Sequence, residues 1–318
     1  MFLAIAFAGA TLALAAGSQA EPPATAATRT AEIGIELPAV GGRRGRKFLG
    51  RYFTPAVMQD IRDNLHATYV RTGWIPDATV LEKQLWRTED QELDTICGAG
   101  LHMMIIVPSL RDDKKGEDDL VADVTAFFSR YTLREFGCLR YAEIGNEADL
   151  RVSGFADVKQ YAPFYLRVAP IIAGFGLKVI TSGTSGSDLP WTATLASILR
   201  RAEPSPPVSG FGFHPYGVLP ALMPQAINQM RAVAGTGSGG AIAEIYVTEI
   251  GQERAADLYQ TIVNLATVTP TITIYEYMAQ PNENPKYGLK DNPALYQAVQ
   301  RAWSTVTANA AELTPDSE

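Results

Sequence analysis

Two widely separated glutamates, Glu147 and Glu249, lie at the ends of apolar runs. The first closes LRYAEIGNE (139–147), and the second lies in IYVTEIG (245–251). A carboxylate beside Tyr, Ile and Val loses hydration energy on burial unless it has partners or a chemical task. Two such carboxylates brought face to face are the minimum equipment for cleaving a glycosidic bond. What matters is therefore whether the fold brings these two residues together.

Eight short β-rich runs alternate with amphipathic stretches of helical spacing, several of which end in glycine. Such alternation predicts a parallel sheet, and eight units in about 280 residues predict a (β/α)8 TIM barrel in a single α/β domain. The expected strands are 31–37, 67–73, 102–108, 140–147, 177–183, 210–217, 245–251 and 272–278. The expected helices are 55–67, 79–100, 119–131, 161–176, 220–235, 253–268 and 292–306.

A doubly wound open sheet is the competing fold. It predicts a glycine-rich phosphate turn after the first strand, but GGRRGRK (41–47) lacks the required GxGxxG order. The other glycine-rich piece, AGTGSGGA (234–241), has no Lys-Ser/Thr and precedes a strand, which is typical of a connecting loop. We therefore expect one catalytic barrel over residues 31–310, followed by a tail at 311–318.

Polar side chains gather at the carboxyl ends of the expected strands, and these ends form one rim of a parallel barrel. Barrel enzymes carry their catalytic groups on that rim. The convergence predicts one site that combines two carboxylates with an arginine, a histidine and several aromatic rings. The candidate residues are Arg71, Trp74, Asn146, Glu147, His214, Tyr216, Glu249, Tyr275, Glu276 and Tyr277.

At these residues the chain resembles glycoside hydrolase clan A, whose cellulase-like and xylosidase-like members are retaining glycosidases. Ile144-Gly145-Asn146-Glu147 matches the clan's Asn-Glu motif, and Thr248-Glu249-Ile250-Gly251 matches its nucleophile motif. His214-Pro215-Tyr216 is similar to its strand-six His/Tyr pair, and Arg71 resembles the arginine that contacts the nucleophile. The resemblance implies a TIM barrel in which Glu147 is the acid/base and Glu249 the nucleophile.

The chain departs from the clan's pattern at two places. Proline commonly follows the acid/base, whereas Ala148 stands here. The aromatic residue of strand eight, often Trp in cellulases, corresponds to Tyr275 or Tyr277. These departures leave the subfamily and the sugar open, but not the reaction class.

Retaining chemistry needs one protonated and one ionised carboxyl about 5–5.5 Å apart. We expect Arg71 to hold Glu249 ionised and an apolar setting to keep Glu147 protonated. We expect Asn146 to donate to a sugar 2-hydroxyl, Tyr216 to position Glu249, and the remaining candidates to bind substrate. Two other hypotheses remain: a non-catalytic glycan-binding barrel, and a metal-dependent barrel hydrolase that uses His214, Glu249 and Glu147.

Two further acidic residues lie on the expected strands. Glu143 shares strand parity with the acid/base candidate but is deeper, so we expect a structural core charge paired with an arginine such as Arg71. Glu36 ends the first strand. It can bind substrate or pair with Arg43 or Arg44, and the sequence leaves both possibilities open.

The first twenty residues are uncharged and apolar and end in Ser18-Gln19-Ala20. This predicts a signal peptide over 1–20, cleaved after Ala20, then a flexible lead-in at 21–30 and a secreted or periplasmic protein without stable membrane insertion. An uncleaved anchor is the competing interpretation. In an oxidising compartment Cys97 and Cys138 can form a disulfide, although two separate buried thiols are equally compatible with the sequence.

The charge balance and the content of cysteine and histidine limit the partners and cofactors that we expect. Lys and Arg number 27 against 34 Asp and Glu, a net charge of −7. This acidic balance argues against nucleic acid and is compatible with a neutral oligo- or polysaccharide substrate. Two cysteines and three scattered histidines make no zinc signature, so we expect neither metal nor cofactor.

Overall fold

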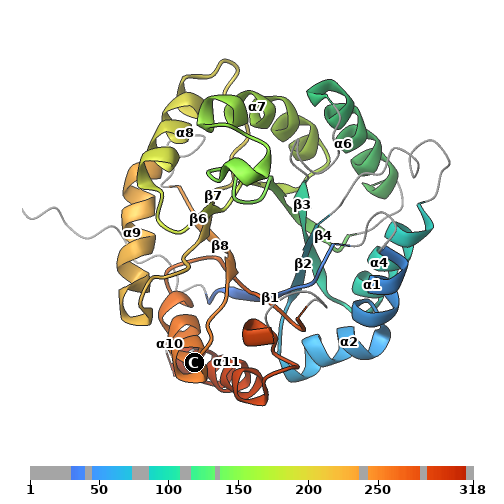
Figure 1. The fold of residues 1–318 in the computed structure, drawn as a ribbon, viewed down its shortest axis with the longest axis vertical. Coiled ribbons are helices and arrows are strands. Elements are labelled where there is room, and N and C mark those ends of the chain that lie inside the picture. Colours follow the sequence, from blue (N-terminus) through green and yellow to red (C-terminus); the bar gives the residue numbers. More distant parts are fainter. Residues whose placement is uncertain are drawn as a thin grey trace, which may run out of the picture.

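The computed structural model describes residues 30–39, 45–73, 86–107, 116–132, 137–235, 243–279 and 285–312. The expected signal peptide, Trp74, Arg43 and Arg44 lie outside these residues. One curled sheet of nine parallel strands forms the interior, and helices form the outer layer (Figure 1). The strand order is β5-β4-β3-β2-β1-β9-β8-β7-β6. The strands are β1 (Glu32–Glu36), β2 (Tyr69–Gly73), β3 (His102–Val107), β4 (Leu139–Ile144), β5 (Lys178–Thr181), β6 (Thr184–Ser185), β7 (Phe211–His214), β8 (Ile245–Ile250) and β9 (Thr271–Ile274).

The expected eight strands appear as nine because a further two-residue strand, β6, comes directly after the fifth expected run, 177–183. β5 pairs with β4, and β6, which begins after two intervening residues, pairs with β7. Backbone bonds also join β5 to the segment before β7: Ser209 N donates to Val179 O at 2.8 Å, and Thr181 N to Gly210 O at 3.1 Å. The two outermost strands of the sheet order are therefore consecutive pieces of the same segment.

Helices cover the outside of this sheet. α1 and α8 were not expected from the sequence; α8 begins after Asp188, whose carboxylate caps it by accepting from Trp191 N at 3.0 Å. Among the described residues, no helix is long and apolar enough to cross a membrane. The helices are α1 (Gly45–Tyr52), α2 (Pro55–Gln59), the π-helix η2 (Asp60–Asn64), α4 (Arg87–Gly98), α6 (Glu117–Thr132), η3 (Arg151–Ser153), α7 (Val158–Gly174), α8 (Leu189–Arg201), η4 (Pro220–Leu222), α9 (Met223–Ala234), α10 (Ala255–Leu265), η6 (Pro285–Tyr287) and α11 (Pro293–Glu312).

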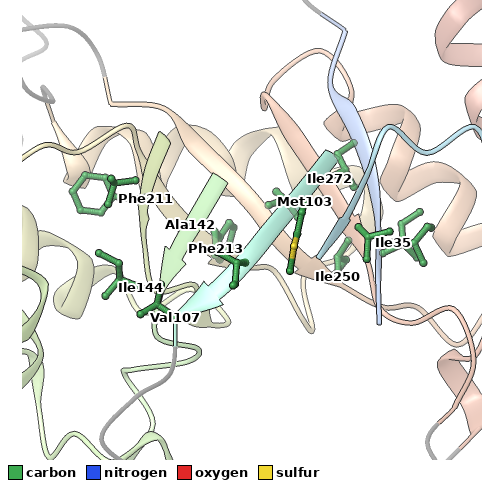
Figure 2. Close-up of a cluster of buried hydrophobic side chains, with 14 of the residues drawn as sticks. Ile35, Met103, Val107, Ala142, Ile144, Phe211, Phe213, Ile250 and Ile272 are labelled. Carbon is green, nitrogen blue, oxygen red and sulfur yellow. The ribbon is translucent and has the colours of Figure 1, made fainter. Parts of the chain in front are cut away.

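Alternate residues of each strand point outward and form the main hydrophobic core beneath the helices. Side chains of this set are drawn in Figure 2, among them Ile35, Met103, Phe213 and Ile272. These side chains are almost wholly buried, which explains why the strands appear as apolar runs in the sequence. The other alternate set points into the curled sheet.

The inward set forms a second, smaller core. It consists of Tyr69, Met104, Tyr141, Ile180 and Tyr246, all nearly inaccessible to solvent. The Tyr141 ring centroid lies 6.1 Å from those of Tyr69 and Tyr246. A side chain at Gly34 on β1 would overlap the Tyr69 ring, so a glycine is required there. This aromatic layer, called here the lower layer, fills the interior of the sheet.

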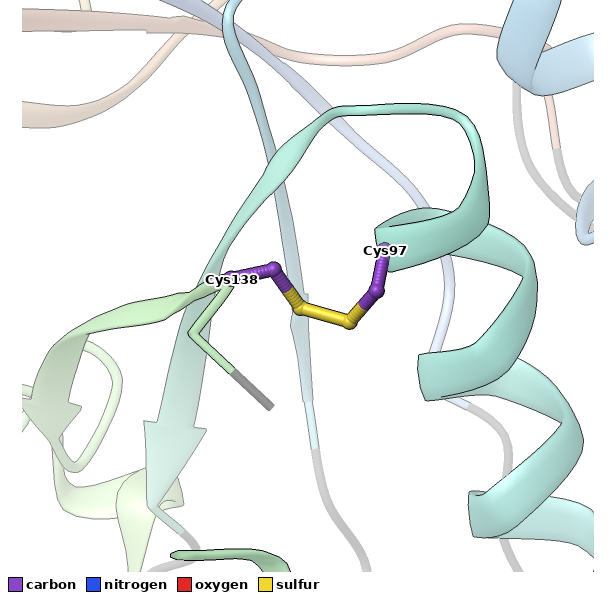
Figure 3. Close-up of a disulfide and its surroundings, with 2 residues drawn as sticks. All are labelled: Cys97 and Cys138. Carbon is purple, nitrogen blue, oxygen red and sulfur yellow. A yellow bond between two sulfur atoms is a disulfide. The ribbon is translucent and has the colours of Figure 1, made fainter. Parts of the chain in front are cut away.

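A disulfide joins Cys97 to Cys138 (Figure 3). It links the end of α4 to the turn that precedes β4, with a Cα–Cα distance of 5.5 Å and a sequence separation of 41 residues. Of the two interpretations left open by the sequence, the structure has the bonded pair. The bond lies at the amino end of β4, away from the end to which Glu147 is attached.

Candidate active site

Above the lower layer the inward side chains become charged. Moving two residues along a strand returns to the same face, so Tyr69 on β2 is followed by Arg71 and Tyr141 on β4 by Glu143. On β8, Tyr246 is likewise followed by Thr248. These residues form the base of a second inward group at the carboxyl ends of the strands.

A register irregularity on β8 brings Glu249 to the same face. Strict alternation would turn Glu249 outward, because Thr248 already faces inward. The pairing of β8 with β9 shifts between Val247 and Ile250, so that Ile250 lies in the outer core while Glu249 faces the interior. Irregularities of this kind often re-aim a side chain next to a functional site.

Glu147 reaches the site from a turn. β4 ends at Ile144, three residues earlier than the end expected from the sequence. Gly145 and Glu147 have positive φ values of 81° and 49°, which bend the chain over the end of the sheet. The bend is held by Glu147 N, which donates to Gly183 O at 3.1 Å, and by Ala148 N, which donates to Ser182 Oγ at 3.0 Å.

Arg71 is the centre of the polar network and is wholly buried. Its Nε donates to Glu143 Oε2 at 2.8 Å, its Nη1 to Glu249 Oε2 at 2.9 Å, and its Nη2 to Asn146 Oδ1 at 2.7 Å. The same Nη1 also donates to Glu36 Oε2. The predicted Arg71–Glu249 and Arg71–Glu143 contacts are therefore present, and Glu36 pairs with Arg71.

Glu249 is held at both oxygens. Tyr216 donates its hydroxyl to Glu249 Oε1 at 2.8 Å, while Arg71 holds Oε2. The Glu249 side chain is 11% exposed, so it remains accessible to a ligand although both of its oxygens are held. A carboxylate whose lone pairs are directed by two donors has one orientation toward a ligand.

His214 lies between the carboxylates and is wholly buried. Its Nε2 is 3.1 Å from Thr248 Oγ1, and Thr248 in turn donates to Glu143 Oε1 at 3.0 Å, so the Thr248 oxygen accepts a hydrogen bond from Nε2–H. Its Nδ1 faces Glu147 Oε1 at 3.4 Å and Glu249 Oε2 at 3.9 Å. A side chain at Gly183 would overlap the imidazole, so this position also requires glycine.

The carboxylates make His214 strongly basic. Burial alone would lower the pKa of His214, but the charge of Glu249 and hydrogen bonds to Glu143 and Glu147 outweigh it and raise the pKa to about 10. The same hydrogen bond from His214 lowers the pKa of Glu147 and outweighs the opposing effect of burial. The expectation that an apolar setting keeps Glu147 protonated is therefore wrong, because His214 is the partner that sets its charge.

Glu143 behaves as the expected core charge. Burial would raise its pKa, but Arg71 and His214 lower it to about 2. Both of its oxygens are occupied, Oε2 by Arg71 and Oε1 by Thr248 and by Gly183 N at 2.8 Å. With no exposed surface, Glu143 orients its neighbours and cannot touch a ligand.

Glu147 and Glu249 come together at His214. One oxygen each of Glu147 and Glu249 and one nitrogen of His214 lie within 4.8 Å of one another. Such a trio could ligate a metal ion, but a ligating imidazole must give up a proton.

The residues after β9 divide between two places. The Tyr275 ring centroid lies 6.0 Å from that of Tyr287, which lies 6.2 Å from that of Tyr216. Tyr275 therefore stands on the Glu249 side of the site. Tyr277 instead donates its hydroxyl to Asp60 Oδ2 at 2.7 Å in the helical layer, so its predicted place in the substrate site is wrong.

Glu276 is buried between these two tyrosines, and its backbone bonds to the segment 287–289. Trp74 lies outside the described residues. Tyr287 and Thr248 were not predicted as site residues. Tyr287 ends the short helix η6, which no sequence pattern indicated, whereas Thr248 could have been identified from its adjacency to Glu249.

Comparison with known proteins identifies the fold. The sequence matches no protein-family model and no curated protein sequence. Among solved structures, a monomeric β-xylosidase from Caulobacter crescentus CB15 aligns with a TM-score of 0.65 and 13% identity over 85% of this chain and 67% of its own. The GH39 enzyme from Xanthomonas axonopodis pv. citri gives 0.67 and 14% over 87% and 67%.

A third similar structure is GH5_18 from Streptomyces cattleya in complex with GlcNAc, with a TM-score of 0.63 and 12% identity over 91% of this chain and 82% of that one. At such identities the likeness concerns the arrangement of strands and helices. The chain has a clan A glycosidase-like fold.

Proposed function

We propose that this protein is a retaining glycoside hydrolase that cleaves O-glycosyl bonds of an oligo- or polysaccharide, with Glu249 as nucleophile and Glu147 as acid/base. The observation that carries the proposal is the approach of their carboxylate oxygens to within 4.8 Å. Retaining enzymes place the two carboxyl groups about 5–5.5 Å apart, whereas inverting enzymes leave about 6.5–9.5 Å for a water molecule. The observed approach favours the retaining geometry.

In the first step, Glu249 attacks the anomeric carbon of the sugar. The bond from this carbon to the leaving oxygen breaks, and that oxygen takes the proton of Glu147. The product is an ester between the sugar and Glu249. Arg71 and Tyr216 hold the attacking carboxylate in one orientation, which reduces the entropy lost on reaching the transition state.

In the second step, Glu147 removes a proton from water. The resulting hydroxide attacks the anomeric carbon and releases the Glu249 carboxylate, so the two inversions give a product of retained configuration. The Oδ1 atom of Asn146 is occupied by Arg71, which leaves its amide N–H groups for a sugar 2-hydroxyl.

His214 supplies the proton that Glu147 needs. In the free protein the pair shares one proton, which stays mainly on His214 Nδ1, 3.4 Å from Glu147 Oε1. Transfer of this proton to Glu147 converts it into the acid and leaves a neutral imidazole. The pair thus remains singly protonated over a wider pH range than an isolated carboxyl would.

Several observations support the proposed class of substrate, the barrel fold and the location of the protein. The β-xylosidase named above acts on glycosides, as its name states, and shares the fold. Counting β5 and β6 as one interrupted strand makes the sheet a (β/α)8 barrel, which we propose as its description. The apolar segment 1–20 favours secretion or a periplasmic location.

A covalent trap tests the function. Incubation with a panel of activated 2-fluoro glycosides should label the protein, and peptide mass spectrometry should place the sugar on Glu249. No adduct with any sugar configuration would contradict the proposal and favour a non-catalytic glycan-binding protein. An adduct formed by the wild type and not by Glu249→Gln confirms the nucleophile.

The stereochemistry and the metal alternative need separate measurements. Product analysis by NMR at early times should show retained anomeric configuration, and an inverted product would overturn the mechanism. Activity should survive exhaustive chelation, since no metal is required for either step. Loss of activity on chelation, restored by a divalent ion, would instead support the trio of Glu147, His214 and Glu249 as a metal site.

A further inference from the structure

The charged side chains of the candidate site differ in solvent exposure: the cations are buried, and three of the carboxylates are partly exposed. The side chains of Arg71 and His214 are 0% exposed, whereas those of Glu36, Glu147 and Glu249 are 14%, 26% and 11% exposed. Within the described residues, a ligand therefore meets carboxyl oxygens with the cations behind them. Lys286, a partly exposed cation next to Tyr287 in sequence, is paired with Glu253 at 2.6 Å.

Glu36 is the member of this group to which the reaction assigns no task. It ends β1, in register with Arg71 on β2. One of its oxygens, Oε2, accepts from Arg71 Nη1, the same nitrogen that holds Glu249 Oε2. Because both carboxylates accept from the same guanidinium nitrogen, Glu36 lies beside the nucleophile, next to the place where the sugar ring must sit.

The other oxygen of Glu36 is available. Oε1 makes no hydrogen bond within the described part of the chain, and the side chain retains some solvent exposure. The wholly buried Glu143, in contrast, has both oxygens occupied. Glu249 also has both oxygens held. Glu36 is thus an acceptor anchored at one end and open at the other.

The pKa of Glu36 also differs from that of the wholly buried Glu143, which is lowered. Burial and the charge of Glu249 raise the pKa of Glu36 well above its usual value, despite the opposing effect of Arg71. A neutral carboxyl can both donate to and accept from a hydroxyl group. An ammonium group at the same place would favour the ionised form and bind it by charge.

We propose that Glu36 is a substrate-binding residue whose open oxygen accepts a hydrogen bond from a donor group of the sugar bound at Glu249, so that the site takes neutral or amino sugars and rejects uronic acids. This inference rests on the proposed glycosidase function. A sugar carboxylate would meet three partly exposed acidic side chains, whereas Arg71 and His214, the cations bonded to them, are wholly buried. The charge of Glu249, which helps to raise the pKa of Glu36, would repel a sugar carboxylate as well.

The test compares aryl β-glycosides that share one leaving group. The panel contains neutral pentosides and hexosides, a glucosaminide and a glucuronide, assayed with wild type, Glu36→Gln and Glu32→Gln. Glu32 lies at the opposite end of β1 and is the matched control. For the wild type we expect kcat/KM on the glucuronide to be at least about 100-fold below that on the best neutral or amino glycoside.

For Glu36→Gln we expect KM on the best glycoside to rise about tenfold, with kcat changed much less, because a ground-state contact is weakened. The ratio of neutral or amino to uronate activity should shrink as well. A larger loss on the glucosaminide than on the glucoside would identify an ammonium group as the bound donor, and equal losses a hydroxyl. The Glu32→Gln control should match the wild type.

Two outcomes would overturn the inference while the proposed function stands. One is a wild-type glucuronidase activity equal to that on neutral glycosides. The other is a Glu36→Gln variant whose KM values and discrimination stay within about twofold of wild type. Failure of the function itself looks different, since then no glycoside is cleaved and no 2-fluoro sugar is trapped by the wild-type protein.

Discussion

Two layers of side chains fill the same curled sheet and share the same strands, yet one stabilises the fold and the other carries the groups that can react. The lower layer, centred on Tyr69, Tyr141 and Tyr246, is aromatic and closely packed. Two residues further along these strands lie Arg71, Glu143 and Thr248, each hydrogen-bonded to another charged or polar group. A shift of about 7 Å along a strand thus separates a layer that stabilises from a layer that can react.

The difference teaches how a charged layer can exist inside a protein. Arg71 has four acceptors, Glu36, Glu143, Asn146 and Glu249, so little of its hydrogen-bonding capacity is lost on burial. Ion pairs of this kind contribute little net stability, because desolvation offsets attraction. The layer formed by Arg71, Glu143, Thr248 and the site residues bonded to them, called here the upper layer, therefore depends on the lower layer and on the main hydrophobic core for its rigidity.

The largest expected effect is the loss of activity when Glu249 of the upper layer is changed. Glu249→Gln keeps the side-chain shape and an acceptor for Tyr216 but removes the attacking charge. We expect kcat/KM to fall by about 10⁴-fold or more, or about 5.5 kcal/mol of barrier, with little change in the unfolding midpoint. Aryl glycoside kinetics and thermal unfolding measure the two effects. Glu253→Gln, four residues on, is the control and should retain activity.

The reciprocal change in the lower layer should act on stability. Tyr69→Ala empties part of the packed interior, and we expect the free energy of unfolding to fall by about 3–5 kcal/mol. Tyr69→Phe removes the hydroxyl contact to Thr273 at 2.7 Å and should cost only about 1 kcal/mol. Urea titration measures both. If Tyr69→Ala unfolded no more readily than Tyr69→Phe, the lower layer would not be the support inferred here.

The disulfide extends the comparison to the amino end of the strands. Closing a loop with a sequence separation of 41 residues restricts the unfolded chain by about 4 kcal/mol in the entropic estimate. The double variant Cys97→Ser/Cys138→Ser should therefore lose up to about this much stability, while kcat/KM at a temperature where it stays folded remains within about twofold. A large loss of activity in the folded variant would show that the two ends of the sheet are coupled.

Much of this arrangement could be predicted from the sequence because strand ends obey simple rules. The alternation of apolar runs and amphipathic stretches located every strand except the short β6, and the carboxyl ends located Glu147, Glu249, Arg71, His214 and Tyr216. Glu143 was correctly assigned to Arg71 from parity alone. These inferences rest on periodicity, which the backbone enforces.

What could not be predicted depends on departures from periodicity. The shift on β8 that turns Glu249 inward leaves no mark on the residue pattern, and the choice between Tyr275 and Tyr277 depends on how the chain leaves β9. The charge of Glu147 required knowledge of the distance to His214. Tertiary contacts of this kind, and not the propensity of single residues, set the electrostatics of the site.

The smallest expected effect tests the proton shared within the upper layer. Two groups govern the alkaline limb of the kcat/KM profile, which is its decline at high pH. They are Glu147, whose pKa is lowered by His214, and His214, whose pKa is raised to about 10. The wild-type pair keeps its one proton until pH rises through the raised value, so activity should persist into the alkaline range. In His214→Gln, Glu147 must hold the proton alone, as an ordinary carboxyl does.

We therefore expect His214→Gln to lower kcat/KM only about tenfold near its own optimum but to move the alkaline limb down by more than one pH unit. A merely structural role would lower activity at every pH without moving the limb. Thr248→Val offers a matched control, because it removes the hydroxyl at Nε2 while leaving Nδ1 opposite Glu147. If both variants kept the wild-type limb, the proton on Glu147 would come from solvent, and the upper layer would differ from the lower one in charge but not in proton transfer.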